Sequence, residues 1–246
     1  MDLGLRDRRA LVTAASKGLG RACAEALVAE GARVYISSRD PRSIEATGRA
    51  IGAVGWYTAD VSRAGEPEAL VNAAIDLLGG LDVLVVNAGG PSPGTLESTP
   101  LEAWAAAFEL TLMSAVRLVK ASLPHLKRSH QGRIVVITSI SVRQPIPNLI
   151  LSSSLRAAVT GLAKSLSAEV AADGITANCL APDAIRTDAL LRLGGDFDSM
   201  AERAPMKRLG EPSEVGAACA FLCSRQAGYI TGQTLGIDGG SLVGVH

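Results

Sequence analysis

Short apolar segments alternate with longer amphipathic segments along the whole chain. The short segments are continuously apolar and have the length of strands, at residues 10–12, 33–37, 54–59, 81–86, 134–138, 175–180 and 234–237. Between them, apolar residues recur at helical spacing at residues 20–27, 41–51, 66–78, 100–129, 152–172 and 212–222. Strands without a polar face are typical of a parallel sheet covered on both faces. The pattern predicts an α/β fold with a doubly wound parallel sheet and helices on both faces.

Composition narrows the possible partners. The 246 residues are 48% hydrophobic, which is enough for a sizeable core, and α/β folds of this length commonly form one domain. Lys plus Arg and Asp plus Glu both number 24, and no basic stripe interleaved with aromatic residues indicates nucleic acid. The apolar segments are far shorter than a membrane span, and the first ten residues lack an apolar secretory segment. We expect a cytoplasmic protein without nucleic-acid or membrane partners.

Four cysteines, Cys23, Cys179, Cys219 and Cys223, lie within apolar patterns. Cys219 and Cys223 could share a helix face, but the three histidines show no arrangement that would complete a metal site. We therefore expect buried thiols and no bound metal.

The first candidate ligand site lies in residues 9–30, where a glycine-containing turn joins the first strand to the first helix. A helix that begins at such a turn directs unpaired N–H groups and the positive end of its dipole at the ligand, and glycine permits close approach. We interpret the turn as a pyrophosphate site formed by Thr13, Ser16, Lys17, Gly18, Leu19 and Gly20. Ala14 stands where a first glycine is expected, a departure that the turn can absorb if the φ of Ala14 is negative.

Small, polar and hydroxyl residues gather at six strand ends. They are Thr13 and Ser16, Ser38 and Arg39, Asp60, residues 87–90, Ser139, and residues 182–187. Ligands of parallel α/β sheets bind beyond the carboxyl ends of the strands, so these residues describe one crevice.

Six ordered motifs resemble those of the short-chain dehydrogenase/reductase family, in the group that contains 3-oxoacyl-carrier-protein reductases. They are residues 13–20 (TAASKGLG), Asn87-Ala88-Gly89, Ser139, residues 178–187 (NCLAPDAIRT), 205–212 (PMKRLGEP) and 230–240 (ITGQTLGIDGG). The resemblance covers essentially the whole chain. It implies a Rossmann-type fold, with residues 1–246 as a single dinucleotide-binding domain, and a homotetramer built partly through residues 102–129 and 152–172.

The resemblance also assigns positions along the cofactor. It places Asp60 and Val61 against the adenine, Asn87, Ala88 and Gly89 along the dinucleotide, and Pro182 and Thr187 near the nicotinamide. A fold that prefers NAD usually carries a carboxylate at the end of strand two, whereas a 2′-phosphate needs a cation. Ser38 and Arg39 occupy that place, and Lys17 could reach the same phosphate. Asp40 lies one or two places too far along, so NADP(H) is favoured over NAD(H).

Catalysis is where the chain departs from the family. The family uses a tyrosine thirteen positions after a serine, a lysine four positions later, and an asparagine on the preceding helix. Ser139 fits the serine, but the other three positions hold Ser152, Arg156 and Thr111. Serine is a poor acid and arginine stays protonated, although Arg156 can still donate hydrogen bonds to the nicotinamide ribose. An equally good interpretation of residues 152–154 is a helix start that serine caps.

Three functional hypotheses follow. The first is an NADP(H)-dependent oxidoreductase that acts on a small carbonyl or alcohol substrate through an altered proton path involving Ser139, Ser152 and Arg156. The second is a non-catalytic NADP(H)-binding protein, either a sensor or a partner subunit of an active relative. The third borrows from halohydrin dehalogenases, which carry arginine in the lysine place but keep the tyrosine and lack the nucleotide-binding glycines, so it fits poorly. We adopt the first.

Substrate identity depends on residues 91–99 and 183–207, where the sequence shows no specific chemistry. Gly194 and Gly195 lie in the second of these regions and predict a mobile lid.

Overall fold

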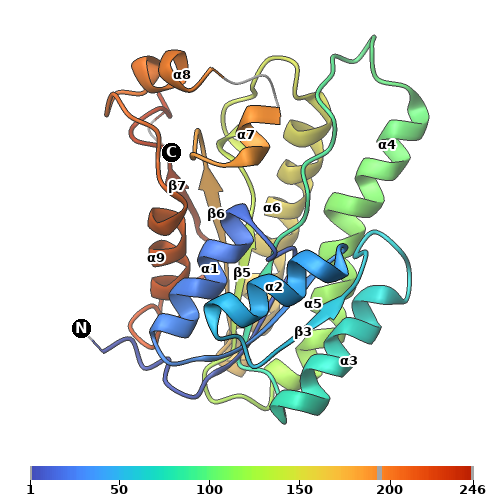
Figure 1. Cartoon of the computed structure of the whole chain (residues 1–246), viewed down its shortest axis with the longest axis vertical. Helices are drawn as coiled ribbons and strands as arrows, with labels where there is room; N and C mark the ends of the chain where they lie inside the picture. The colour runs from blue at the N-terminus through green and yellow to red at the C-terminus, as the bar shows by residue number, and fades with distance from the viewer. Residues whose placement is uncertain (1, 193–195, 245–246) are drawn as a thin grey trace.

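A seven-stranded parallel sheet forms the centre of the computed structural model, which describes residues 2–192 and 196–244 (Figure 1). The strands are β1 (Arg9–Val12), β2 (Arg33–Ser38), β3 (Gly55–Thr58), β4 (Val83–Val86), β5 (Arg133–Ile137), β6 (Thr176–Pro182) and β7 (Thr234–Ile237). Their spatial order is β3-β2-β1-β4-β5-β6-β7, so the winding direction reverses between β1 and β4. A reversal of this kind opens a crevice at the carboxyl ends of the strands.

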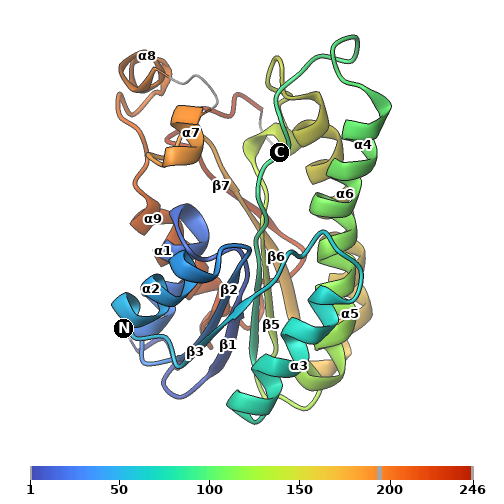
Figure 2. The same ribbon diagram turned by 45° about the vertical axis from the view of Figure 1, so that its right-hand side comes forward.

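Helices cover both faces of the sheet, which confirms the predicted doubly wound Rossmann-type fold. Figure 2 shows one layer formed by α1 (Gly18–Ala29), α2 (Pro41–Ile51) and α9 (Pro212–Cys223), and an opposite layer formed by α3 (Glu66–Leu78), α5 (Ser114–Leu126) and α6 (Ile150–Val170). Each layer has its own apolar core against the sheet. Leu27, Ile44 and Val215 belong to the first core, and Leu70, Leu118 and Val159 belong to the second.

All four cysteines are buried free thiols, as the apolar pattern predicted. Cys23, Cys219 and Cys223 belong to the core beneath α1 and α9. Within residues 2–192 and 196–244, no group of three His, Cys, Asp or Glu side chains has the arrangement of a metal site. No helix in that part of the chain combines the length and apolarity of a bilayer span.

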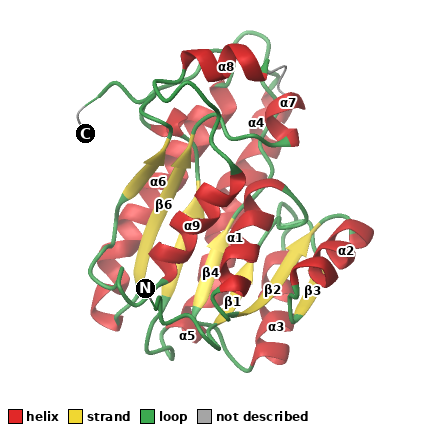
Figure 3. Ribbon diagram, turned by 60° about the vertical axis from the view of Figure 1, so that its left-hand side comes forward, coloured by secondary structure: helices red, strands yellow, loops and turns green. Residues whose placement is uncertain are grey.

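Two regions differ from the sequence pattern. The helix expected over residues 100–129 is divided into α4 (Leu101–Phe108), the π-helical segment η1 (Glu109–Met113) and α5. Single π-helical turns are rare in proteins, but those that occur are frequently found at functional sites. The region 183–210, for which no regular element was predicted, contains α7 (Asp188–Arg192) and α8 (Phe197–Arg203), which lie beyond the carboxyl ends of the strands (Figure 3). The lid predicted from Gly194 and Gly195 lies outside the described residues.

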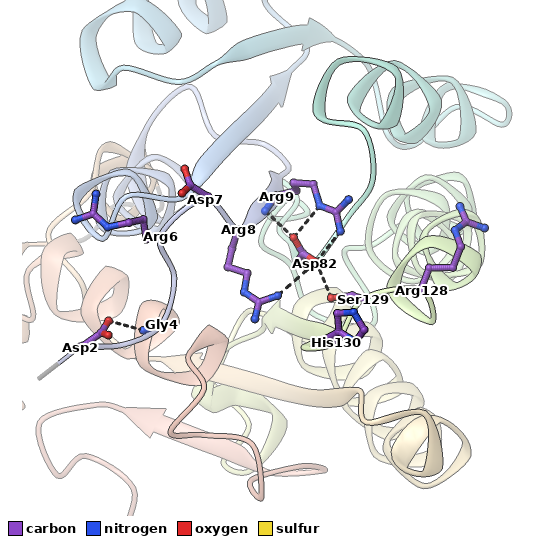
Figure 4. A pocket seen from close by; sticks show the side chains of 10 residues that line it. All are labelled: Asp2, Gly4, Arg6, Asp7, Arg8, Arg9, Asp82, Arg128, Ser129 and His130. Carbon is purple, nitrogen blue, oxygen red and sulfur yellow. Dashed lines mark hydrogen bonds and ion pairs between the residues drawn. The ribbon is translucent and has the colours of Figure 1, made fainter.

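An ion pair between Arg9 and Asp82 joins β1 to β4 at the opposite end of the sheet, beside a cavity of about 850 Å³ (Figure 4). Arg9 donates from its backbone N and its Nε to Oδ2 of Asp82, both at 2.9 Å. Ser129 donates to Oδ1 at 2.6 Å. Burial alone raises the pKa of Asp82, but the hydrogen bonds from Arg9 and Ser129 lower it to about 2. Because these groups satisfy one another, we interpret the cluster as structural.

We predict that Asp82→Asn lowers the free energy of unfolding by about 3 kcal/mol, because the Arg9 guanidinium loses its partner. The lowered pKa means that the carboxylate stabilises the fold above its unfolded pKa of about 3.9. This contribution is lost as pH falls toward the folded value of about 2. Urea unfolding at several pH values measures both effects. Asp76→Asn, an exposed carboxylate on α3, is the control, and equal stability of the two variants would contradict the assignment.

Candidate active site

A cavity of about 930 Å³ lies at the carboxyl ends of the strands and has the size of a site for a large organic ligand. It brings together most of the residues that the sequence nominated. Those that line it are Ser16, Lys17, Gly18, Leu19, Ser38, Arg39, Val61, Asn87, Ala88, Gly89, Ser139, Ser152, Arg156, Pro182 and Thr187. Thr13, Gly20, Asp60 and Thr111 do not belong to the lining, and their positions are described below.

Thr13 and Gly20 shape the turn between β1 and α1. The buried Thr13 hydroxyl donates to the backbone O of Asn87 at 2.6 Å and accepts from the backbone N of Asn87 at 2.9 Å. The Asn87 side chain donates to the backbone O of Ala14 at 3.1 Å. A Cβ added at Gly20 would lie 2.4 Å from the same Ala14 oxygen, so only glycine permits this close packing. These contacts hold the N-terminus of α1 against the crevice.

Ala14 adopts a left-handed conformation with a φ of 48°, so the condition of a negative φ is not met and the turn places a non-glycine residue in the left-handed region. A residue with a Cβ pays about 1–2 kcal/mol in this region, because its Cβ approaches the following carbonyl. A glycine at position 14 would adopt this φ without the steric cost, because glycine has no Cβ. The strain is retained because the contacts of Asn87 and Gly20 fix the Ala14 carbonyl.

The charge pattern at the end of β2 favours a phosphate. Asp40 caps α2: its carboxylate accepts from the backbone N of Ser43 at 2.6 Å, and hydrogen bonds from Ser43 lower its pKa. Asp40 also lines the cavity, but its carboxylate is engaged in capping α2. Arg39 extends across the crevice, since its Nη2 lies 4.0 Å from where a Gly89 Cβ would be. Arg39 and Lys17 both line the cavity, and they present two cations to a bound anion.

Asp60 lies at the edge of the same region, beyond β3. Burial raises the pKa of its carboxyl, but hydrogen bonds from Ser62 and the charges of Arg39 and Arg63 lower it overall. Its Oδ1 accepts from the Ser62 backbone N at 3.1 Å and from the Ser62 hydroxyl at 2.7 Å. Asp60 thus orders the loop next to Val61, which does line the cavity.

Ser139 terminates β5 with its hydroxyl in the cavity wall. It caps the short 3₁₀ helix η2 (Ile140–Val142), where its Oγ accepts from the backbone N of Ser141 at 3.2 Å. This contact uses a lone pair of the oxygen and leaves the hydroxyl proton to donate toward a ligand. Ser139 can therefore hold and polarise a substrate oxygen.

Arg156 extends from α6 toward the end of β5. Its Nη1 donates to the backbone oxygens of Ile137 and Thr138, both at 3.1 Å. Its Nη2 lies 4.0 Å from where a Gly90 Cβ would be. Burial lowers the pKa of the guanidinium, yet arginine remains protonated in proteins. Arg156 is thus a fixed cation in the cavity wall and an anchor for β5.

Ser152 lies one helical turn before Arg156 and also lines the cavity. Helix α6 begins at Ile150, and Leu149 occupies the cap position without a side-chain hydrogen bond. The interpretation of residues 152–154 as a helix cap is therefore wrong, because these serines lie inside the first turns of the helix. The hydroxyl of Ser152 faces the site from this position.

Thr111 lies in the π-helical segment η1, which contacts α6. Its side chain is buried, and its Oγ1 has no hydrogen-bond partner among the described residues. The preceding residue, Leu110, lines the cavity instead. Thr111 therefore stands behind the cavity wall.

Asp183 lines the cavity and lies within residues 182–187, which the sequence placed at the crevice without a role for this carboxyl. It directly follows β6, and its backbone N donates to the O of Ile237 at the end of β7 at 3.2 Å. Burial is the largest influence on the pKa of the Asp183 carboxyl and raises it. The nearby charge of Asp238 raises this pKa as well. A carboxylate placed directly after a strand end was the available signal, because all the strands end at the crevice.

These features define a Rossmann-type α/β protein in which a glycine-containing turn, two cations and polar residues after β5 and β6 line one cavity at the strand ends. The chain belongs to the short-chain dehydrogenase/reductase family. The family profile described as enoyl-(acyl carrier protein) reductase matches residues 13–241. The chain is 36% identical to bovine dehydrogenase/reductase SDR family member 4 over 97% of this chain and 88% of that protein. It is also 36% identical to the 3-oxoacyl-[acyl-carrier-protein] reductase of Vibrio cholerae, over 97% and 98%.

Solved structures agree with this assignment. The L-sorbose reductase of Gluconobacter frateurii, complexed with NADPH and L-sorbose, superposes with a TM-score of 0.95 at 30% identity, and 100% of both chains is covered. An NADPH-dependent reductase involved in bacilysin biosynthesis superposes with a TM-score of 0.91 at 30% identity, covering 97% of this chain and 100% of that chain.

We predict that Ala14→Gly raises the free energy of unfolding by about 0.5–1 kcal/mol, because relief of the positive φ exceeds the entropy cost of glycine. Thermal unfolding without ligand measures the effect. Ala29→Gly, at the end of α1 in ordinary helical conformation, is the control and is expected to destabilise. A loss of stability in Ala14→Gly would show that the turn holds no strain at this residue.

Proposed function

We propose that this protein is an NADP(H)-dependent oxidoreductase that interconverts the carbonyl and alcohol groups of a small substrate. One observation carries the choice of cofactor: Lys17 and Arg39 line the cavity, while Asp40, the nearest alternative ribose acceptor, is engaged in capping α2. The NADPH complex of L-sorbose reductase and the NADPH dependence of the reductase involved in bacilysin biosynthesis support the same choice. The cofactor, when bound, supplies or accepts the hydride.

The chain's own residues would divide the binding among them. The N–H groups at the start of α1 and the Gly18 turn suit the pyrophosphate, because Lys17 makes no side-chain cap there. Arg39 and Lys17 suit the 2′-phosphate. Arg156 donates to the ribose and, through Ile137 and Thr138, keeps the end of β5 in place. Pro182 and Thr187 line the same cavity, and we assign them to the nicotinamide.

The substrate site requires an altered proton path. Ser139 donates a hydrogen bond to the substrate oxygen, and Ser152 extends the polar wall toward water. The fixed charge of Arg156 stabilises negative charge that develops on that oxygen. None of these three groups is a good acid near neutral pH, because serine is weakly acidic and arginine stays protonated.

A non-catalytic NADP(H)-binding protein remains the second candidate function, because Arg156 is committed to two backbone carbonyls and Ser152 replaces the family tyrosine. The homotetramer and the cytoplasmic location that we expect from the sequence stay predictions.

We predict that NADPH binds more tightly than NADH and that Arg39→Ala weakens NADPH binding by about 10–100-fold, the value of a charge-assisted hydrogen bond. NADH binding should change little, since NADH has no 2′-phosphate. Titration of nicotinamide fluorescence measures both affinities. Arg42→Ala removes an exposed cation of α2 outside the cavity and serves as the control. Equal losses for the two nucleotides would contradict a phosphate contact.

We predict that the purified protein oxidises NADPH in the presence of a carbonyl substrate from a panel of ketones, 3-oxoacyl thioesters and quinones. Ser139→Ala should lower kcat/KM by about 10–100-fold, since one transition-state hydrogen bond is lost. NADPH fluorescence confirms that the variant still binds the nucleotide. Tight binding with no turnover on the whole panel would reject the enzyme and favour the second function.

A further inference from the structure

Arg156 is a cation of the cavity wall that no described residue neutralises. Its Nη1 donates to the backbone oxygens of Ile137 and Thr138, whereas Nε and Nη2 have no acceptor within residues 2–192 and 196–244. No carboxylate in that part of the chain forms an ion pair with the guanidinium, and burial alone lowers its pKa. A cation withdrawn from water without a counter-ion is costly for a fold. The free donors of Arg156 are therefore available to an anionic ligand.

The phosphates of the cofactor suit another part of the cavity. The proposed function assigns them to the start of α1, to Lys17 and to Arg39 at the end of β2. Arg156 reaches the cavity from α6, which belongs to the layer on the other face of the sheet (Figure 2). Its Nη2 lies 4.0 Å from where a Gly90 Cβ would be, beside the loop that follows β4. The ribose assigned to Arg156 is uncharged, so the substrate is the molecule that can bring an anion to this site.

Ser152 leaves room for such an anion. It lies one helical turn before Arg156, it lines the same cavity, and its hydroxyl makes no hydrogen bond in the described part of the chain. The tyrosine that the family carries at this position would fill the space with a phenol ring. A carboxylate that enters this space can accept from the Ser152 hydroxyl and from the free N–H groups of Arg156.

The reacting carbonyl lies close to this anion site. Ser139 directly follows Thr138, whose backbone oxygen accepts from Arg156. Because one residue of an extended chain spans about 3.3 Å, the Ser139 hydroxyl and the guanidinium can bind groups on neighbouring carbon atoms. Ser139 can hold a ketone oxygen while Arg156 and Ser152 hold a carboxylate on the carbonyl carbon or on the next carbon.

The rest of the wall favours one orientation of such a substrate. Two carboxyls, Asp183 and Asp188, also line the cavity and offer no favourable contact to negative charge. Leu110, Leu149 and Ile185 line it as well and offer apolar contacts. The anionic end of the substrate should therefore face α6, and its apolar end should face these three side chains.

We propose that the substrate of the reduction is a short oxo acid, whose carboxylate binds Arg156 and Ser152 while its carbonyl oxygen binds Ser139. The assignment rests on the proposed function and names its substrate class. It also accounts for both departures from the family pattern on α6. The planar guanidinium of arginine matches a carboxylate with two parallel hydrogen bonds, which an ammonium group cannot do, and the small serine leaves the space that the carboxylate needs.

Matched substrates test the carboxylate directly. Short 2-oxo and 3-oxo acids should be reduced with a kcat/KM about 10–100-fold above that of their methyl esters, the value of a charge-assisted hydrogen bond. Arg156→Gln should abolish this preference. Arg156→Lys loses the same contacts to β5 but keeps the charge, so it should retain part of the preference. Arg42→Gln, which changes an exposed cation of α2 outside the cavity, is the matched control and should behave as wild type.

Ser152→Tyr tests the same site without altering Arg156. The phenol ring should occupy the space of the carboxylate, so the preference for acids over esters should fall by about 10–100-fold. NADPH fluorescence checks that each variant folds and binds the nucleotide.

Unreactive analogues provide a readout without turnover. Oxamate and malonamate carry an amide in place of the ketone, and the NADPH complex of the wild-type protein should bind at least one of them. Arg156→Gln should weaken this binding by about 10–100-fold, and Arg42→Gln should not.

Three results overturn the substrate class and leave the proposed function standing. They are equal use of acids and esters, no binding of either analogue, and a preference for acids that survives both Arg156→Gln and Ser152→Tyr. A protein that binds the analogues through Arg156 but reduces no carbonyl compound overturns the proposed function, and the substrate class falls with it.

Discussion

The two hydrogen bonds between Thr13 and Asn87 join the carboxyl ends of β1 and β4 at the point where the strand order reverses. Adjacent strands that wind in opposite directions leave a gap between their loops, and this gap is the crevice. The Asn87 side chain then fixes the Ala14 carbonyl, against which Gly20 and the start of α1 pack. The helix N-terminus, the cations beside it and the left-handed Ala14 all follow from this one junction.

The polar groups of the crevice show a division between folding and binding. Asp40 and Asp60 make local contacts that order a helix start and a loop, and Thr13 binds the backbone of Asn87 on the neighbouring strand. Lys17 and Arg39 make no side-chain hydrogen bond in the described residues and line the cavity. Two cations are therefore available to a bound phosphate at this end of the cavity.

The sequence predicted the fold well because apolar strands and helical periodicity are local signals, and the bounds of α2 and α3 were predicted to the residue. It also placed most cavity residues, since the ends of parallel strands necessarily meet. Other features depend on three-dimensional packing. The positive φ of Ala14, the π-helical turn at Thr111 and the start of α6 before Ser152 are set by neighbours distant in the chain. The sequence placed Asp183 at the crevice within residues 182–187 but could not show that the charge of Asp238, from another strand's loop, lies beside it.

The electrostatic arrangement explains how an arginine can replace a lysine at the active site. A lysine in this position would present a compact ammonium on a flexible stem, with three rotatable donors. Arg156 instead binds two carbonyls of β5 and acts as a fixed charge next to Ser139. A fixed cation stabilises the oxyanion that develops but supplies no proton.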